Sequence, residues 1–385
     1  MIKYCEINNF FSIGDEQIVD FSLNNRKDFA ANPVIGFAGS NASGKTNVLR
    51  AFAFLRFFIS ESFLGLKPDS NIPSEPFFTQ PGKDTSFFVI FAIDGRDYGY
   101  KLEFFGAAVS LEELSLYEDD NTGQMQPIFV RKKNEIDRGS LVTPIPIQDL
   151  RDNSSYISYA KQFNSQELIK KIATYFENFS VNILMHGIKP IGYSWQSTLK
   201  LLEFEERRTQ ALKILKYADV AIQDIKVIKH TQKELESMEL EAYTEAFYHN
   251  IDGRILPFLG AERMSAGTLQ MLAVLPSILY ALEKGTVVIW DEIEIKLHQN
   301  LVAYLIGLFQ NPSQNPKQGQ LIFSFHNTVF MDILTPEQLW FAEKNERGRT
   351  EIFCAAQFQD LKDLHRHSLE KLYRVGRFGA KPSAL

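Results

Sequence analysis

A complete G-x-x-x-x-G-K-[ST] pattern occupies residues 39–46 of this chain, which read Gly-Ser-Asn-Ala-Ser-Gly-Lys-Thr. The two glycines allow a tight turn whose backbone N–H groups can face phosphate oxygens. Lys45 can reach the outer phosphates of a nucleoside triphosphate, and the Thr46 hydroxyl can bind Mg²⁺. The alternative is a glycine-rich turn without a ligand, and the presence of all four fixed residues disfavours it. The candidate nucleotide-binding residues of this P-loop are Gly39, Ser40, Asn41, Ala42, Ser43, Gly44, Lys45, Thr46 and Asn47.

Two acids follow an apolar run in the last third of the chain. Residues 286–290 read as a buried strand, and Asp291 and Glu292 come at its carboxyl end. A magnesium–nucleotide site needs carboxylates delivered in this way. Asp291 is therefore the candidate metal ligand beside Thr46, and Glu292 is the candidate general base for an attacking water. An ordinary strand end is the alternative, and the P-loop in the same chain favours the functional interpretation.

A second group of small polar residues begins another helix. Ser265-Ala266-Gly267-Thr268 precede the apolar run 269–282. A helix start of this kind can bind an anion, although the geometry of one chain would not bring it to its own P-loop phosphates. A plain helix cap by Ser265 or Thr268 is the alternative, and one residue can serve both purposes. Downstream, His326 follows a further apolar strand, where it could contact the γ-phosphate or the water; a lone histidine after a strand is usually structural.

These residues need elements that position them. Residues 33–38 read as a strand before the P-loop, and residues 47–55 as a helix whose positive end faces the phosphates. Residues 2–23 alternate like a hairpin beside that strand, and Asp94-Gly95 marks a second hairpin. We expect three parts: 1–124, with the P-loop and an antiparallel β subdomain; 125–221, an inserted and mainly helical subdomain; and 222–385, with the remaining motifs.

Composition narrows the class of protein. The chain has 385 residues, is 45% hydrophobic and carries a net charge of −6, so nothing global indicates nucleic-acid binding. Its two cysteines, Cys5 and Cys354, lack metal-type spacing and suit a reducing compartment. The longest apolar run, 269–282, is short for a bilayer span and contains Pro276. We expect a cytoplasmic protein without membrane association.

The order of the motifs resembles the ABC-type ATPase head. Within that class it is similar to the group that contains RecF, the SMC proteins, the OLD nucleases and the AAA-family ATPases of bacterial abortive infection. Residues 39–46 match Walker A, 287–292 match Walker B, 265–268 match a reduced signature motif, and His326 matches the switch histidine. Softer matches, including Tyr373 to Pro382, point to the AbiL/RloA and PARIS-type defence ATPases. The resemblance implies an α/β fold with a P-loop parallel sheet core.

The resemblance also implies a mechanism. Two heads would form a homodimer, or part of a higher homo-oligomer, with two ATP molecules and Mg²⁺ between them. Each ATP would contact Lys45 and Thr46 of one copy and Ser265, Ala266 and Gly267 of the other. We expect an ATPase without a nuclease domain that regulates a separately encoded toxin or nuclease in anti-phage defence. The alternatives are a RecF-like or SMC-like repair ATPase that clamps DNA directly, and a nucleotide-binding subunit with little turnover.

Overall fold

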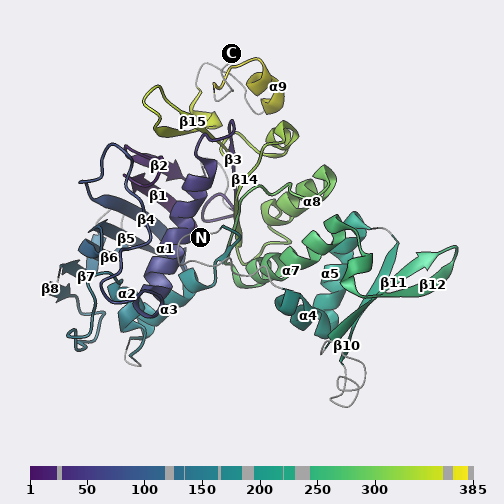
Figure 1. Ribbon diagram of the computed structural model, residues 1–385, viewed down its shortest axis with the longest axis horizontal. Coiled ribbons are helices and arrows are strands. Elements are labelled where there is room, and N and C mark those ends of the chain that lie inside the picture. The colour runs from purple at the N-terminus through teal and green to yellow at the C-terminus, as the bar shows by residue number, and fades with distance from the viewer. Residues whose placement is uncertain are drawn as a thin grey trace.

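The long helix α1 (Lys45–Gly65) lies between two β-sheets in the computed structural model (Figure 1). The structure describes residues 1–23, 28–117, 125–133, 135–163, 166–183, 195–219, 221–229, 243–358 and 367–379. Mixed α/β architecture, with one sheet built around the P-loop strand, confirms the expected fold class.

A seven-stranded antiparallel sheet covers one side of α1. Its strands, in spatial order, are β2 (Gln17–Asp20), β1 (Ile2–Asn8), β4 (Thr85–Ile93), β5 (Arg96–Phe105), β6 (Ala108–Tyr117), β7 (Met125–Lys132) and β8 (Glu135–Arg138). The N-terminal hairpin forms as expected, with Tyr4 opposite Asp20, but it belongs to this sheet and not to that of the P-loop strand. The Asp94-Gly95 turn is also confirmed, since Ile93 pairs with Arg96.

A six-stranded sheet carries the candidate site. Its order is β16 (Thr350–Cys354), β15 (Leu339–Lys344), β3 (Val34–Ala38), β14 (Gln320–Ser324), β13 (Val287–Trp290) and β9 (Ser180–Val181). Neighbouring strands are parallel except for β15 and β16. The carboxyl ends of β3, β13 and β14 therefore lie at one edge, where ligands bind in open parallel sheets.

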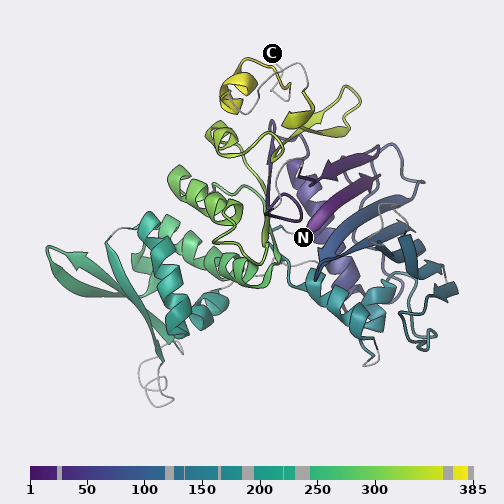
Figure 2. The ribbon, with the colours of Figure 1, turned by 180° about the vertical axis from the view of Figure 1, so that it is seen from behind.

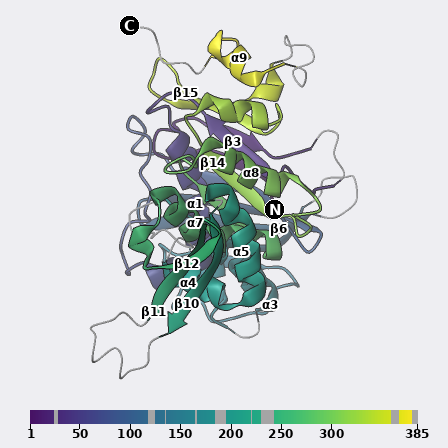
Figure 3. The ribbon, with the colours of Figure 1, turned by 90° about the vertical axis from the view of Figure 1, so that its right-hand side faces the viewer.

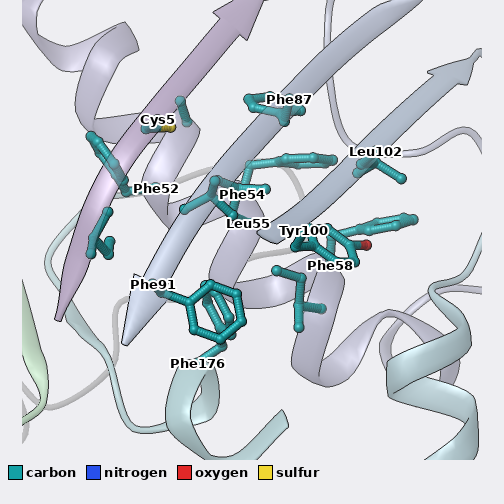
Figure 4. Packing of buried hydrophobic residues seen from close by; sticks show 14 of the residues in the cluster. Cys5, Phe52, Phe54, Leu55, Phe58, Phe87, Phe91, Tyr100, Leu102 and Phe176 are labelled. Carbon is teal, nitrogen blue, oxygen red and sulfur yellow. The ribbon is translucent and has the colours of Figure 1, made fainter. Parts of the chain in front are cut away.

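Both faces of the parallel strands are buried, which explains their continuous apolar runs. Phe37 and Ile289 face the core around α1, whereas their neighbours Ala38 and Trp290 face the core on the opposite side. Aromatic rings fill the first core (Figure 4). Phe54 of α1 stacks on Phe87 of β4, with ring centroids 5.1 Å apart. Much of the phenylalanine content therefore serves packing between α1 and the sheets.

A second lobe packs on the other face of the parallel sheet (Figures 1 and 2). Its helices are α4 (Trp195–Glu203), α5 (Glu205–Ala218), α7 (Ala266–Lys284) and α8 (Gln299–Gln310). The strands β10 (Ile222–Lys229), β11 (Tyr243–Ile251) and β12 (Arg254–Leu259) form a three-stranded sheet that projects from it. By length and composition, α7 alone among the described helices could cross a membrane, but its buried residues Met271, Leu272 and Leu275 belong to the core.

The stretch 125–221, expected as one helical insertion, contributes to several regions. Strands β7 and β8 extend the antiparallel sheet, and α2 (Tyr156–Ala160) and α3 (Glu167–Glu177) pack on α1, whereas α4 and α5 pack on α7. Helical spacing in the sequence locates helices, but it does not say which neighbours they bury against.

The C-terminal segment packs beside β15 at one end of the molecule (Figure 3). It contains η2 (Thr328–Ile333), η3 (Ala355–Gln357) and α9 (Leu369–Arg374), and α9 contacts η2. The short helix η1 (Ala261–Arg263) lies elsewhere, just before α7. Tyr373 and Phe378 stack on Phe341 of β15. Packing thus accounts for these residues of the C-terminal pattern, and residues 380–382 of that pattern lie outside the described residues.

Candidate functional site

The P-loop glycines occupy backbone conformations and spaces that exclude other side chains. Gly39 has φ of 146° and Gly44 has φ of 107°, both in the region that favours glycine. A Cβ atom at Gly39 would lie 2.2 Å from the carbonyl oxygen of Ala342. One at Gly44 would lie 2.1 Å from Oγ1 of Thr350. The loop is therefore pressed against β15 and β16, and its shape depends on both glycines.

The start of α1 is prepared for an anion. No side chain caps this helix, so its first N–H groups are available to phosphate oxygens. Lys45 is only 4% exposed, and its Nζ donates hydrogen bonds of 2.9 Å to the carbonyl oxygens of both Gly39 and Ser40. Burial lowers the pKa of Lys45, while the nearby acids Asp291, Glu292 and Glu294 raise it. A triphosphate would give this buried ammonium stronger partners than two carbonyls.

The two candidate metal ligands meet each other. Thr46 Oγ1 donates a hydrogen bond of 2.9 Å to Oδ2 of Asp291. Asp291 Oδ1 accepts one of 2.5 Å from Ser324 Oγ. Asn182 fixes the backbone of Asp291, because its side-chain amide donates to the Asp291 carbonyl oxygen and accepts from the Asp291 N–H. A hydroxyl and a carboxylate side by side are the oxygen ligands that Mg²⁺ uses together with nucleotide phosphates, so these residues fit the metal.

The candidate base and the candidate switch histidine are also in contact. His326 Nε2 lies 3.3 Å from Oε1 of Glu292. Both side chains are partly open to solvent, at 38% and 42% exposure respectively, as groups that must reach a substrate should be. Glu292 has φ of 54°, a conformation that a non-glycine residue adopts at some cost. The turn after β13 is therefore held in an unusual shape where the proposed chemistry takes place.

One cavity of about 500 Å³ joins these groups. It is lined by Ser12, Asn41, Ala42, Ser43, Gly44, Lys45, Thr46, Asn47, Asp291, Glu292, His326 and Lys344. Five parts of the chain that are distant in sequence thus form one site of a size suited to a small ligand. Gly39 and Ser40 contribute through their carbonyl oxygens behind Lys45.

A comparison with protein families identifies this arrangement. The family described as "AAA domain, putative AbiEii toxin, Type IV TA system" matches residues 34–332, a span that contains the P-loop, both acids and His326. The chain belongs to this AAA family. Membership confirms the resemblance to the AAA-family ATPases of abortive infection, and the protein is a P-loop ATPase.

No curated protein matches the chain. Among solved structures, the SMC head domain from Thermotoga maritima aligns with a TM-score of 0.44 at 14% identity, over 92% of this chain and 98% of that one.

The residues predicted as a reduced signature lie at the exposed start of α7. Ser265 is the N-cap, and its Oγ accepts a hydrogen bond of 3.1 Å from the Thr268 N–H. Ser265 and Ala266 are exposed, and neither they nor Gly267 is among the residues that line the P-loop cavity. The structure therefore brings together the P-loop, Asp291, Glu292 and His326, and leaves Ser265, Ala266 and Gly267 on another surface.

Sequence reasoning missed Thr350, which connects three segments at the P-loop. Its Oγ1 donates a hydrogen bond of 2.9 Å to the carbonyl oxygen of Ser43 and lies 2.8 Å from Oγ of Ser12. Ser12 Oγ in turn accepts a bond of 2.6 Å from Asn47 Nδ2. No sequence signal marks Thr350, because its importance comes from contacts that only the fold creates.

Lys344 was missed as well. It stands at the end of β15, lines the cavity, and is exposed, with its Nζ bonded to the carbonyl oxygen of Gly348 at 3.1 Å. A lysine on a strand beside the P-loop strand could have been noticed, but one lysine among many carries little signal before the strand order is known.

Proposed function

We propose that the protein is an ATP-dependent switch that works as a homodimer and controls a separately encoded effector, a toxin or a nuclease, in anti-phage defence. ATP binding would close two heads on each other, and hydrolysis would let them open. Membership of the AAA family supports a P-loop ATPase. The dimer, the effector and the defence role are proposed in addition.

One observation carries the dimer. The cavity contains Lys45, the Thr46–Asp291 pair and the Glu292–His326 pair, while the anion-binding start of α7 at Ser265 is exposed elsewhere. A helix start is suited to phosphate, because its first N–H groups lack partners within the helix; of these, Ser265 Oγ bonds that of Thr268. A second copy that placed its Ser265, Ala266 and Gly267 over the cavity would complete the site, and twofold symmetry would complete the other site at the same time.

The residues of the cavity support hydrolysis. Thr46 and Asp291 would hold Mg²⁺, which neutralises phosphate charge when it is bound. Lys45 would bind the outer phosphates. Glu292 would take a proton from the water that attacks the γ-phosphorus, while the bond from that phosphorus to the bridging oxygen breaks. His326, in contact with Glu292, would hold the γ-phosphate or the water in place.

Two observations favour control of an effector over direct action on DNA. The family description names a putative toxin of a type IV toxin–antitoxin system, which supports a role in a system of two gene products and does not say which of them this chain is. The net charge of −6 gives no general attraction to DNA. A DNA clamp, the second candidate, would instead show affinity that falls steeply with added salt.

Co-purification tests the effector. The chain would be expressed with the product of the adjacent gene, with and without ATP, using Glu292→Gln to keep ATP bound and Lys45→Ala to prevent binding. We expect the partner to bind Glu292→Gln and Lys45→Ala to different extents. A chain that protects cells from phage without any partner would overturn effector control, and steep salt-dependent binding to DNA would replace it with the clamp.

Light scattering tests the dimer. We expect Glu292→Gln to form dimers or larger assemblies with Mg-ATP and to separate when ATP is removed. Lys45→Ala should not respond to ATP. A wild-type monomer with full ATPase activity would overturn the proposed two-headed site.

A further inference from the structure

Glu294 lies two residues after the candidate base, in the turn that follows β13. Its Oε1 accepts a hydrogen bond of 2.5 Å from the backbone N–H of His326 and one of 3.2 Å from that of Asn327. Hydrogen bonds to an ionised carboxylate are about twice as strong as those between neutral groups. Glu294 therefore holds the backbone of the residue that carries the imidazole of the site.

The same turn is attached to β14 at a neighbouring point. The N–H of Glu292 donates to Ser324 Oγ at 2.8 Å, and the N–H of Ile293 donates to the Ser324 carbonyl oxygen at 3.1 Å. These bonds fix the strand end two residues before His326. Glu294 adds the contact that reaches His326 itself, so the ring is held by Glu292 and the backbone by Glu294.

The second carboxylate oxygen of Glu294 points to a role beyond packing. Among the described residues, Oε2 is buried and has no hydrogen-bond partner. An enclosed and unpaired polar oxygen costs stability, and proteins retain such groups where function needs them.

We propose that Glu294 is a positioning residue for hydrolysis, which fixes the His326 imidazole against Glu292 by binding the backbone N–H groups of His326 and Asn327. The proposal rests on the hydrolysis proposed for Glu292. Glu294 does not line the cavity, so it acts through His326 and not on the nucleotide. Its loss should lower kcat and leave the affinity for ATP unchanged.

A double-mutant cycle tests this role. We expect Glu294→Ala to lower kcat by about tenfold or more with an unchanged Kd for ATP, and Glu294→Gln to lose less, because its amide oxygen still accepts a hydrogen bond. In a His326→Ala background, Glu294→Ala should cause no further loss. Losses that multiply, or a kcat that Glu294→Ala leaves unchanged, would overturn the proposal. Glu346→Ala removes an exposed acid from a turn and should leave kcat unaltered.

Hydrogen exchange tests the contact without relying on hydrolysis. Glu294→Ala should speed exchange of the His326 and Asn327 amides and leave the P-loop peptide unaffected. Unchanged exchange at these two amides would overturn the positioning role. A wild-type chain that does not hydrolyse ATP would refute the proposed function, and the exchange result would still decide the role of Glu294. If Glu294→Ala does not fold, Glu294→Leu, which also removes the acceptor, takes its place in both measurements.

Discussion

Thr46 and Asp291 are 245 residues apart in sequence, and a hydrogen bond of 2.9 Å joins Oγ1 of the first to Oδ2 of the second. The two side chains form the candidate metal-binding part of the site. We predict that Asp291→Asn abolishes the gain in ATP affinity that Mg²⁺ provides, because an amide is a much poorer ligand for the cation than a carboxylate. Calorimetric titration with ATP, with Mg²⁺ and then with EDTA, measures this gain. An equal gain in Asp291→Asn and wild type would contradict the assignment.

Glu292 is predicted to be the general base. Glu292→Gln keeps the size of the side chain but cannot take a proton, so hydrolysis should fall by roughly 10²- to 10⁴-fold. ATP binding should persist, because Lys45, Thr46 and Asp291 are untouched. Single-turnover release of phosphate and equilibrium binding of ATP separate the two effects. A variant that loses ATP binding as well would indicate that Glu292 supports the fold of the turn.

The parts of the site that are local in sequence could be predicted. The P-loop is predicted because phosphate binding requires particular residues at fixed positions of a short segment. Asp291 and Glu292 are predicted because they end a short apolar strand. His326 is predicted to belong to the site only because it follows the P-loop, residues 265–268 and the two acids in the chain. The contact of its ring with Glu292, at 3.3 Å, needed the parallel pairing of β13 and β14.

The parts that depend on distant contacts could not be predicted. Thr350 meets Ser43 across 307 residues, and no spacing rule connects two such positions. The division of residues 125–221 could not be predicted for the same reason, because apolar spacing marks α3 and α5 as helices but does not say that they cover different cores. Glu294 did have a signal, as an acid two residues after the base, but its partners are backbone N–H groups that carry no sequence identity.

Thr350 is predicted to stabilise the P-loop. Thr350→Val keeps the shape of the side chain but removes the hydrogen bond to the carbonyl oxygen of Ser43 and the one with the hydroxyl of Ser12, which then keeps only its bond from Asn47. Loss of a buried partner costs about 1–3 kcal/mol, so the free energy of unfolding should fall by that amount and ATP affinity should fall with it. Calorimetry measures both. Thr209→Val, at an exposed helix position, is the matched control and should change neither.

Lys344 ends β15 and Asp291 follows β13, on opposite sides of the P-loop strand β3, so Lys344 is predicted to bind a phosphate from the side of the cavity opposite Asp291. Lys344→Ala should weaken ATP binding by about tenfold, equal to about 1.4 kcal/mol. The loss should shrink at high salt, because the side chain is exposed and its charge is screened. Lys317→Ala removes an exposed lysine that lies outside this cavity and should bind ATP normally. An equal loss in both variants would indicate a general effect of charge.

The final prediction concerns the exposed signature residue Ser265. In a twofold dimer, Lys45→Ala disables a site through one chain and Ser265→Arg disables it through the other. Each variant alone should be inactive, but a mixture of the two contains heterodimers with one intact site. An equal mixture should therefore recover about a quarter of wild-type ATPase activity.

A matched mixture gives the control for this recovery. Lys45 and Glu292 line the same cavity of one chain, so a heterodimer of Lys45→Ala with Glu292→Gln has no intact site and should stay inactive. Recovery in both mixtures would mean that activity returns by a route other than an ATP site shared between two copies of the chain. Absence of recovery in the Ser265→Arg mixture, when scattering shows that heterodimers form, would place Ser265 outside the ATP site. Recovery in that mixture alone is the result that requires each ATP to contact two copies of the chain.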